Sequence, residues 1–244
     1  MTLRVDGRCG LCREDVSFHV GDVPADGSLR ETLRCPRCGC IARQRAVAAL
    51  LLHDPCAIDG RVYITEQASA LYLALRARIP GLLGSEWAPS PWRRLRLSAW
   101  LWRRGAAARV RHQDVTALRF DAGSLDAIAS LDVLEHVPDY RAGLREFARV
   151  LRPGGRLLLC VPYMHDRDDT ETLARREAGG AITHLQPPEY HGDPMGGGVL
   201  CWHRFGRDLL DALREAGFRE ADALPVQDPA AGLPQPVWVL SAVR

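Results

Sequence analysis

The chain has 244 residues, 47% of them hydrophobic, which is enough to bury the core of one α/β domain and to carry a small additional module. Its formal charge of +2 gives no overall attraction to nucleic acid or to an anionic membrane, and all of its basic residues are arginine, a bias that we attribute to codon usage. The sequence has no signal-peptide pattern and no segment close to 18 consecutive apolar residues, so we expect a cytoplasmic protein without a membrane partner. In that reducing setting the cysteines are expected to be metal ligands or buried thiols.

Two Cys-x-x-Cys pairs with 22 residues between them open the chain: Cys9 with Cys12, and Cys35 with Cys38. Each pair can place two thiolates on one ion, and two such turns complete a tetrahedral site with no open coordination position. The sequence therefore predicts a structural zinc ribbon over residues 1–42. Cys40 is an alternative to Cys38 as the fourth ligand. Between the pairs, residues 13–34 are expected to form a β-hairpin around a Gly/Pro/Asp turn.

The main domain is expected over residues 43–244, with insertions at 87–108 and 163–206. Its expected elements are a helix at 41–54, a strand at 61–65, a helix at 68–79, strands at 82–86, 109–114 and 125–134, a helix capped by Asp139, a strand at 156–162, a helix at 207–216 ending at Gly217, and strands from 218 and at 237–243. The Pro-rich segment 225–236 is expected to be a loop. Strands that alternate with helices predict a parallel sheet covered on both faces.

The segment SLDVLEHVPDYRAGLREFARVLRPGGRLLLCVP, residues 130–162, resembles the central signature of class I S-adenosylmethionine-dependent methyltransferases of type 11. The upstream QDVTALRFDAGSLDAI and the downstream FGRDLLDALREAGF fit the same pattern, so the resemblance covers most of residues 60–243. It implies a Rossmann-like sheet of seven strands, mostly parallel, with helices on both faces. The ribbon at the N-terminus resembles that of a bacterial subgroup of this family.

The resemblance implies S-adenosylmethionine as the cofactor, bound outside the carboxyl ends of the strands. The turn after the first strand has no glycine, but this cofactor carries no phosphate that needs a glycine-rich nest. Glu66 supplies negative charge there, and N–H groups at the helix start can receive the methionine carboxylate. Glu86 would hold the ribose hydroxyls, and Asp114 with the N–H of Val115 would hold the adenine. The implied cofactor residues are Glu66, Gln67, Ala68, Glu86, Trp87, Asp114, Val115, Leu131, Asp132 and Val133.

Histidines gather in the insertion 163–206, on the side of the sheet where the donor methyl group should point: His165, His184, His191 and His203. Histidine is suited to removing a proton from an attacking hydroxyl or amine. We expect His191, in the stiff segment PPEYHGDP, to be this base, with His136 as the second candidate. Surface histidines are the alternative, and positioning alone can suffice for methyl transfer. A second metal site is conceivable, but the histidine spacings match no compact ligand template.

The insertion 87–108 and the residues that follow it interleave Trp92, Trp100 and Trp102 with arginines. Stacking aromatics beside guanidinium groups can hold single-stranded nucleic acid. We favour an amphipathic lid helix with its tryptophans on the core side, because the global charge is near neutral.

The sequence thus predicts an S-adenosylmethionine-dependent methyltransferase with a structural zinc ribbon, acting on a small or conjugated metabolite such as a saccharide or peptide natural product. One alternative is an RNA methyltransferase that uses the ribbon to recognise RNA. The other is a non-catalytic module whose cofactor site has decayed and whose ribbon binds proteins.

Overall fold

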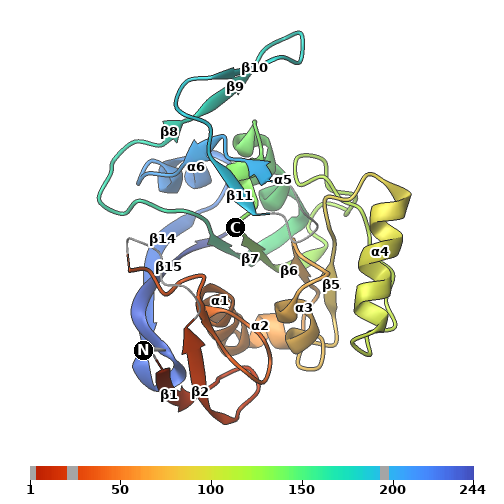
Figure 1. The fold of residues 1–244 in the computed structure, drawn as a ribbon. Helices are drawn as coiled ribbons and strands as arrows, with labels where there is room; N and C mark the ends of the chain where they lie inside the picture. The colour runs from red at the N-terminus through yellow and green to blue at the C-terminus, as the bar shows by residue number, and fades with distance from the viewer. Residues whose placement is uncertain (1–3, 21–26, 193–197) are drawn as a thin grey trace.

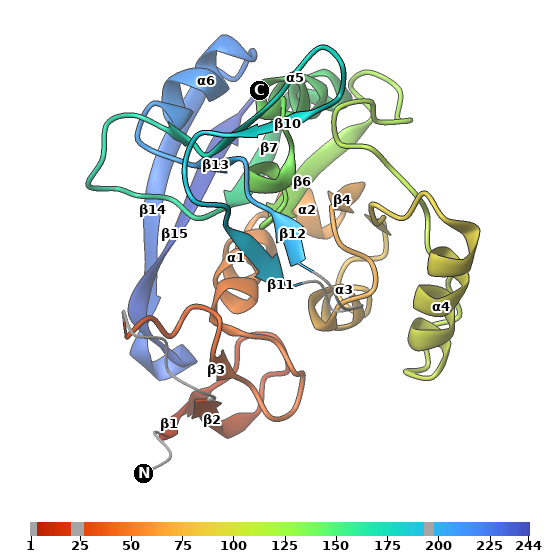
Figure 2. The ribbon, with the colours of Figure 1, turned by 45° about the horizontal axis from the view of Figure 1, so that its top comes forward.

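The computed structural model describes residues 4–20, 27–192 and 198–244, and a central sheet organises them (Figures 1 and 2). Its six strands are, in spatial order, β14 (Glu220–Asp228), β15 (Leu233–Val243), β7 (Leu151–Cys160), β6 (Leu125–Leu131), β4 (Val62–Ile64) and β5 (Leu82–Gly84). β15 is antiparallel to both of its neighbours, and the other five strands all run in one direction. The predicted mostly parallel sheet is confirmed.

Alternating side chains along the strands bury both faces of the sheet. In β4, Val62 and Ile64 join a core on one face, and Tyr63 joins a second core on the opposite face. The first face is covered by α1 (Ala42–His53), α2 (Pro55–Ile58) and α3 (Ala70–Leu75), and the second by α5 (Tyr140–Val150) and α6 (Leu209–Glu215). Asp139 caps α5 by accepting a hydrogen bond from the N–H of Ala142, as predicted.

Two expected elements differ from the observed ones. The expected strand 109–114 is reduced to a single parallel bridge between His112 and Glu86, so the central sheet has six strands among the described residues and not the seven expected. The segment expected as a loop, 225–236, instead completes a long hairpin of β14 and β15 around a short 3₁₀ turn, η2 (Pro229–Ala231). Its prolines are tolerated because β14 is an edge strand and β15 pairs with β7 only from Leu240 onward.

The N-terminal ribbon packs directly on the main domain. It consists of β1 (Arg4–Arg8), β2 (Asp15–Val20) and β3 (Leu33–Arg34), in which β2 pairs with both neighbours; the expected turn between β2 and β3 falls on residues 21–26, outside the described residues. Helix α1 lies between the ribbon and the sheet, so it is buried on most of its surface. Ribbon residues share one buried core with α1, α3 and β15.

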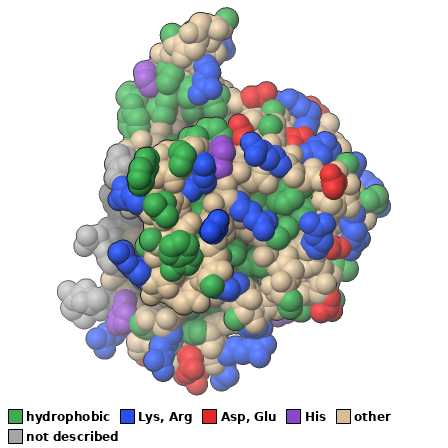
Figure 3. Space-filling model, turned by 90° about the vertical axis from the view of Figure 1, so that its right-hand side faces the viewer, with side chains coloured by type: hydrophobic (Ala, Val, Ile, Leu, Met, Phe, Trp, Pro, Cys, Tyr) green, Lys and Arg blue, Asp and Glu red, His purple; other side chains and the backbone are tan. Residues whose placement is uncertain are grey.

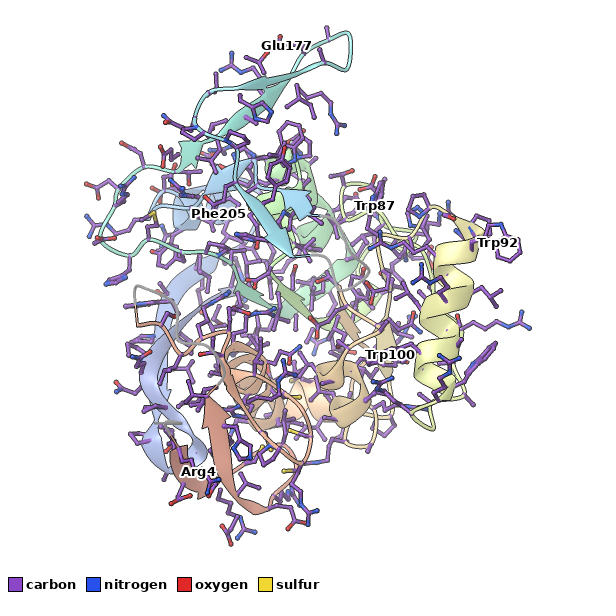
Figure 4. All side chains as sticks on the ribbon, in the orientation of Figure 1. Arg4, Trp87, Trp92, Trp100, Glu177 and Phe205 are labelled. Atoms are coloured by element: carbon purple, nitrogen blue, oxygen red, sulfur yellow. The ribbon has the colours of Figure 1, made fainter. Side chains whose placement is uncertain are left out.

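The insertions form two separate features. The first contains α4 (Pro91–Trp102), which packs beside β5 through Leu97 and Leu101. The second contains short strands: β8 (Glu171–Thr172), β9 (Ala174–Arg176), β10 (Ile182–His184), β11 (Tyr190–Gly192), β12 (Gly198–Leu200) and β13 (His203–Arg204). The β9–β10 hairpin forms an arm that extends from the body at the top of Figure 1, and Figure 4 marks Glu177 near its tip. Among the described residues no helix is long and apolar enough to span a membrane.

Candidate functional site

The four cysteines of the two Cys-x-x-Cys pairs meet at one point in the ribbon. Their sulfur atoms lie within 4.8 Å of one another, and the distances Cys9 Sγ–Cys38 Sγ and Cys12 Sγ–Cys35 Sγ are both 3.8 Å. Zinc–sulfur bonds of about 2.3 Å in a tetrahedron place sulfurs about 3.8 Å apart, so the cluster fits a zinc ion. Cys40, the alternative ligand, lies outside this cluster.

Both cysteine turns have the same backbone geometry. In the first turn the N–H of Arg13 donates to the carbonyl of Cys9, and in the second the N–H of Gly39 donates to the carbonyl of Cys35. Arg13 and Gly39 both have positive φ angles, 61° and 74°. Hydrogen bonding to Cys38 and burial raise the pKa of the Cys9 thiol to about 12, so without a cation this thiol stays protonated.

Arg45 connects the ribbon to the turn between β14 and β15 by hydrogen bonds. Its guanidinium donates to the backbone carbonyls of Leu33, Cys40 and Gly232, and lies 4.3 Å from the ring centroid of Phe18. Gly232 has φ of 73°, and a Cβ atom there would lie 2.2 Å from the Phe18 ring. The ribbon and the β14–β15 hairpin therefore meet too closely for any other residue at this position.

A cleft of about 1050 Å³ opens at the carboxyl ends of β4, β5 and β6, the expected location for a ligand in such a sheet. Of the predicted cofactor residues, six line it: Glu86, Trp87, Asp114, Val115, Asp132 and Val133. The predicted catalytic candidate His136 lines it as well, and the neighbour of His191, Gly192, reaches it from the insertion. Glu66, Gln67, Ala68 and Leu131 are not among its lining residues.

The glycine-free turn after β4 is held by Glu86. One carboxylate oxygen of Glu86 accepts hydrogen bonds from the N–H groups of Gln67 (2.7 Å) and Ala68 (2.6 Å), and burial raises the pKa of this carboxyl group. These two N–H groups are therefore taken by Glu86 in this conformation, and the first helical residue of α3 is Ala70. Glu66 faces away from them and accepts a hydrogen bond from the Gln44 side chain in α1.

Asp114 forms a tight turn at the bottom of the cleft. Its Oδ1 accepts hydrogen bonds from the backbone N–H and the hydroxyl of Thr116, so this oxygen fixes the loop that carries Val115. Trp87 lies at the cleft mouth, 60% exposed, with its ring edge-on to His112 at 5.0 Å (Figure 4). An aromatic face and a carboxylate thus flank the same part of the cleft.

Two arginines from the N-terminal region hold Asp132, which follows β6 in the left-handed conformation with φ of 47°. Arg30 of the ribbon forms a bidentate pair with its carboxylate, and Arg43 of α1 lies 2.8 Å from its Oδ2. Despite the desolvation of burial, these cations lower the pKa of Asp132. Sequence reasoning missed both arginines, because the many arginines of the chain give no local signal.

Removing both arginines is expected to destabilise the protein by about 3–5 kcal/mol, because it leaves a buried carboxylate without a counter-charge. Urea unfolding of Arg30→Ala with Arg43→Ala measures this loss. Adding Asp132→Asn to that variant should restore part of the stability. Equal losses with and without Asp132→Asn would show that the ion pairs are not the cause.

The two candidate bases converge on a buried carboxylate that the sequence analysis did not consider. The rings of His136 and His191 are perpendicular, with centroids 5.0 Å apart. Glu135 Oε1 lies 3.9 Å from His136 Nε2 and 3.8 Å from His191 Nδ1. The Gly-Asp-Pro turn expected after His191 falls partly on residues 193–197, outside the described residues.

The other histidines of the insertion have different surroundings. His165 stacks on Trp238, His184 is exposed on β10, and His203 is buried with its Nε2 3.2 Å from the carbonyl oxygen of Pro138. Only His203 among these three lines the cleft described above.

Helix α4 keeps one of its three tryptophans, Trp100, against the core, and the expectation is wrong for Trp92 and Trp102. Trp92 is 76% exposed and Trp102 48% exposed, and Figure 4 shows Trp92 pointing away from the body. The face of the molecule that carries α4 interleaves arginine with apolar side chains (Figure 3). The other core contacts of α4 come from Leu97 and Leu101, which are buried in the core that also contains residues of α1 and α3.

Comparison with known proteins connects this arrangement to one class of enzyme. Residues 91–159 match the sequence profile of the family described as "Methyltransferase domain". The demethylmenaquinone methyltransferase of Mycolicibacterium gilvum is 55% identical over 47 residues, 19% of this chain and 21% of that protein. The ubiquinone biosynthesis O-methyltransferase of Xanthomonas oryzae pv. oryzae is 54% identical over 37 residues, 15% of this chain and 16% of that protein. The chain thus spans about a fifth of the length of the first of these relatives and less of the second.

The fold matches a solved structure over most of its length. The S-adenosylmethionine-dependent methyltransferase of Mesorhizobium loti superposes with a TM-score of 0.52 at 21% identity, covering 82% of this chain and 96% of that one. The Rossmann-like fold predicted from the sequence is therefore confirmed.

Proposed function

We propose that this protein, which has the fold and the central sequence segment of the class I S-adenosylmethionine-dependent methyltransferases, transfers a methyl group to a small or conjugated metabolite. The observation that carries the proposal is the cleft at the carboxyl ends of the strands, with carboxylates along it and histidines at one end. S-adenosylmethionine would supply an electrophilic methyl group there; the acceptor would gain this group and lose a proton.

The residues of the cleft fit this cofactor better than a dinucleotide. The N–H groups of Gln67 and Ala68 in the turn after β4 bind Glu86, so that turn offers no free N–H nest to a pyrophosphate. A ligand with a cationic sulfonium and hydroxyl groups to donate suits the carboxylates that line the cleft. We propose that Asp114 and Val115 hold the adenine beside Trp87 and that Glu86 receives the ribose hydroxyls through the oxygen that does not bind the turn.

We propose that the acceptor binds at the end of the cleft formed by His136, Gly192 and the β9–β10 arm, next to His191. His136 lines the cleft, and so do Arg175 and Arg176 of β9, which are exposed. These arginines suit a conjugated acceptor that carries an anionic group. The quinone-pathway names of the two relatives support a small-molecule acceptor, and a saccharide or peptide natural product is the class that we propose.

Cofactor binding tests the proposal directly. Calorimetry is expected to show binding of S-adenosylmethionine and of its demethylated product, and no binding of NAD. Glu86→Gln and Asp114→Asn should weaken the binding of both cofactor forms, whereas Asp211→Asn on the exposed side of α6 should not. Binding of NAD alone would overturn the assignment.

We propose that the ribbon, residues 1–42, is a structural zinc module and that 43–244 form the catalytic domain. The shared core and the Arg30–Asp132 pair support a role of the ribbon in shaping the cleft.

RNA methylation stays the second candidate, because Trp92 and Trp102 are exposed among arginines on α4. We expect only weak binding of a generic single-stranded RNA, since the net charge is +2. Filter binding at low and high salt measures it. Tight, salt-dependent binding that is lost when Arg93, Arg94, Arg103 and Arg104 are neutralised would favour the RNA candidate instead.

A further inference from the structure

Glu135 is a fully buried carboxylate without a hydrogen-bond partner. Its exposed fraction is 0%, and neither Oε1 nor Oε2 has a partner within the described parts of the chain. Its backbone is fixed, because its carbonyl accepts a hydrogen bond from the N–H of Trp202. A rigid, buried and unpaired carboxylate requires either a proton or a cation.

Both neighbouring histidines direct one ring nitrogen towards this carboxylate and use the other in a hydrogen bond. His136 has Nδ1 2.9 Å from the carbonyl oxygen of Leu200, and His191 has Nε2 3.3 Å from a carboxylate oxygen of Glu189. The nitrogens nearest to Glu135 Oε1 are the remaining ones, His136 Nε2 and His191 Nδ1. With Nδ1–H of His136 donating to Leu200, its Nε2 presents a lone pair to the carboxylate.

This pairing of each histidine with a carbonyl or a carboxylate is typical of metal sites, where the outer partner fixes the tautomer of the ligand. Cys201 lies beside the two histidines: ligand atoms of His136, His191 and Cys201 lie within 4.8 Å of one another, and Cys201 Sγ is 4.0 Å from His136 Nδ1, the nitrogen that faces Leu200. These residues come from η1 (Leu134–His136), from β11 and from the residue after β12, so tertiary structure assembles them.

We propose that Glu135, His136 and His191, with Cys201 beside them, bind one divalent transition-metal ion of the zinc type. A set of one carboxylate and two imidazole ligands suits a borderline ion such as Zn²⁺ better than Mg²⁺ or Ca²⁺, which prefer oxygen ligands alone. The site is separate from the four-cysteine cluster of the ribbon. It borders the cleft through His136, so a coordination position is available to a ligand from that side.

The neighbouring arginines are paired with carboxylates other than Glu135, so they do not neutralise it. Arg30 and Arg43 approach the same region, but both pair with Asp132, and both also pair with Glu31. Glu189, behind His191, pairs with Arg204. With these arginines matched by carboxylates, Glu135 is the charge that a metal ion would neutralise.

One consequence rests on the proposed function. If the cleft binds a methyl acceptor, the ion would take the acceptor oxygen as a further ligand and lower the pKa of its hydroxyl group, so that the proton leaves to solvent before the methyl group arrives. His136 and His191 would then serve the reaction by holding the ion.

Zinc stoichiometry of the full-length protein tests the site without the cofactor. The protein is incubated with Zn²⁺, passed through a desalting column and analysed by inductively coupled plasma mass spectrometry. We expect two ions per chain for the wild type and one for Glu135→Gln and for His191→Ala. His184→Ala, in the same insertion but exposed on β10, should keep two. Glu189→Gln should lower the affinity of the second site for its ion by about 10–100-fold, measured by titration with Co²⁺.

Circular dichroism and melting curves establish that each variant is folded before its metal is counted. Glu135→Gln is nearly isosteric, so it supports the result if His191→Ala unfolds. A single ion in the wild type, or two ions in both Glu135→Gln and His191→Ala, would overturn the proposal. Cofactor calorimetry is a separate measurement, so a failure of the metal site and a failure of the methyltransferase assignment are distinguishable.

Discussion

Replacing His191 with alanine is expected to lower methyl-transfer turnover by about 10²–10⁴-fold while the affinity for S-adenosylmethionine stays nearly unchanged. The side chain contacts Glu135 and Glu189 at the proposed acceptor end, away from Glu86 and Asp114 at the proposed adenosine end. Loss of a group that acts only on the acceptor should therefore affect the rate and leave cofactor binding intact.

The measurement needs turnover, cofactor affinity and melting temperature of the same variant. His184→Ala is the matched control, because it removes an exposed histidine of the same insertion. A structural role of His191 would lower the melting temperature together with turnover. If turnover falls by less than about tenfold, His191 is not the base, and His136 becomes the residue to test.

Replacing Cys9 and Cys35 with serine is expected to remove one zinc ion per chain and several kcal/mol of unfolding free energy. Structural zinc contributes its binding energy to folding, and a domain has only about 5–15 kcal/mol of stability in total. Loss of the ion should also destabilise the main domain, because Cys9 and Cys35 belong to the same buried core as residues of α1 and β15.

Two cysteine variants serve as controls for this experiment. Cys56→Ser changes an exposed thiol on α2 and should alter neither zinc content nor stability. Cys40→Ser changes a buried thiol outside the cluster, so it should keep the ion. Loss of zinc in Cys40→Ser, with retention in Cys38→Ser, would make Cys40 the fourth ligand. Retention of all zinc in the variant with both Cys9→Ser and Cys35→Ser would contradict a four-cysteine site.

Local patterns in the sequence were sufficient for most of the strands and helices of the main domain outside its insertions. Asp139 is a helix cap whose acceptor oxygen meets the N–H of Ala142, an interaction within four residues. The Cys-x-x-Cys pairs also act locally, since each turn is closed by its own backbone hydrogen bond. The prolines in 225–236 led to the wrong expectation of a loop. A proline is compatible with a strand where its side of the strand has no hydrogen-bonded neighbour, and the local sequence does not show this.

The α/β order of elements, the cysteine turns and the acids that follow successive strands can be predicted from local sequence, because each depends on residues within a few positions of one another. The partners of those residues depend on how distant segments pack in the folded chain. Arg30 reaches Asp132 across 102 positions, Arg45 reaches Gly232 across 187, and His191 meets Glu135 between separate elements. Such long-range charge pairs leave no periodic trace in a chain whose basic residues are all arginine, so folding alone brings them together.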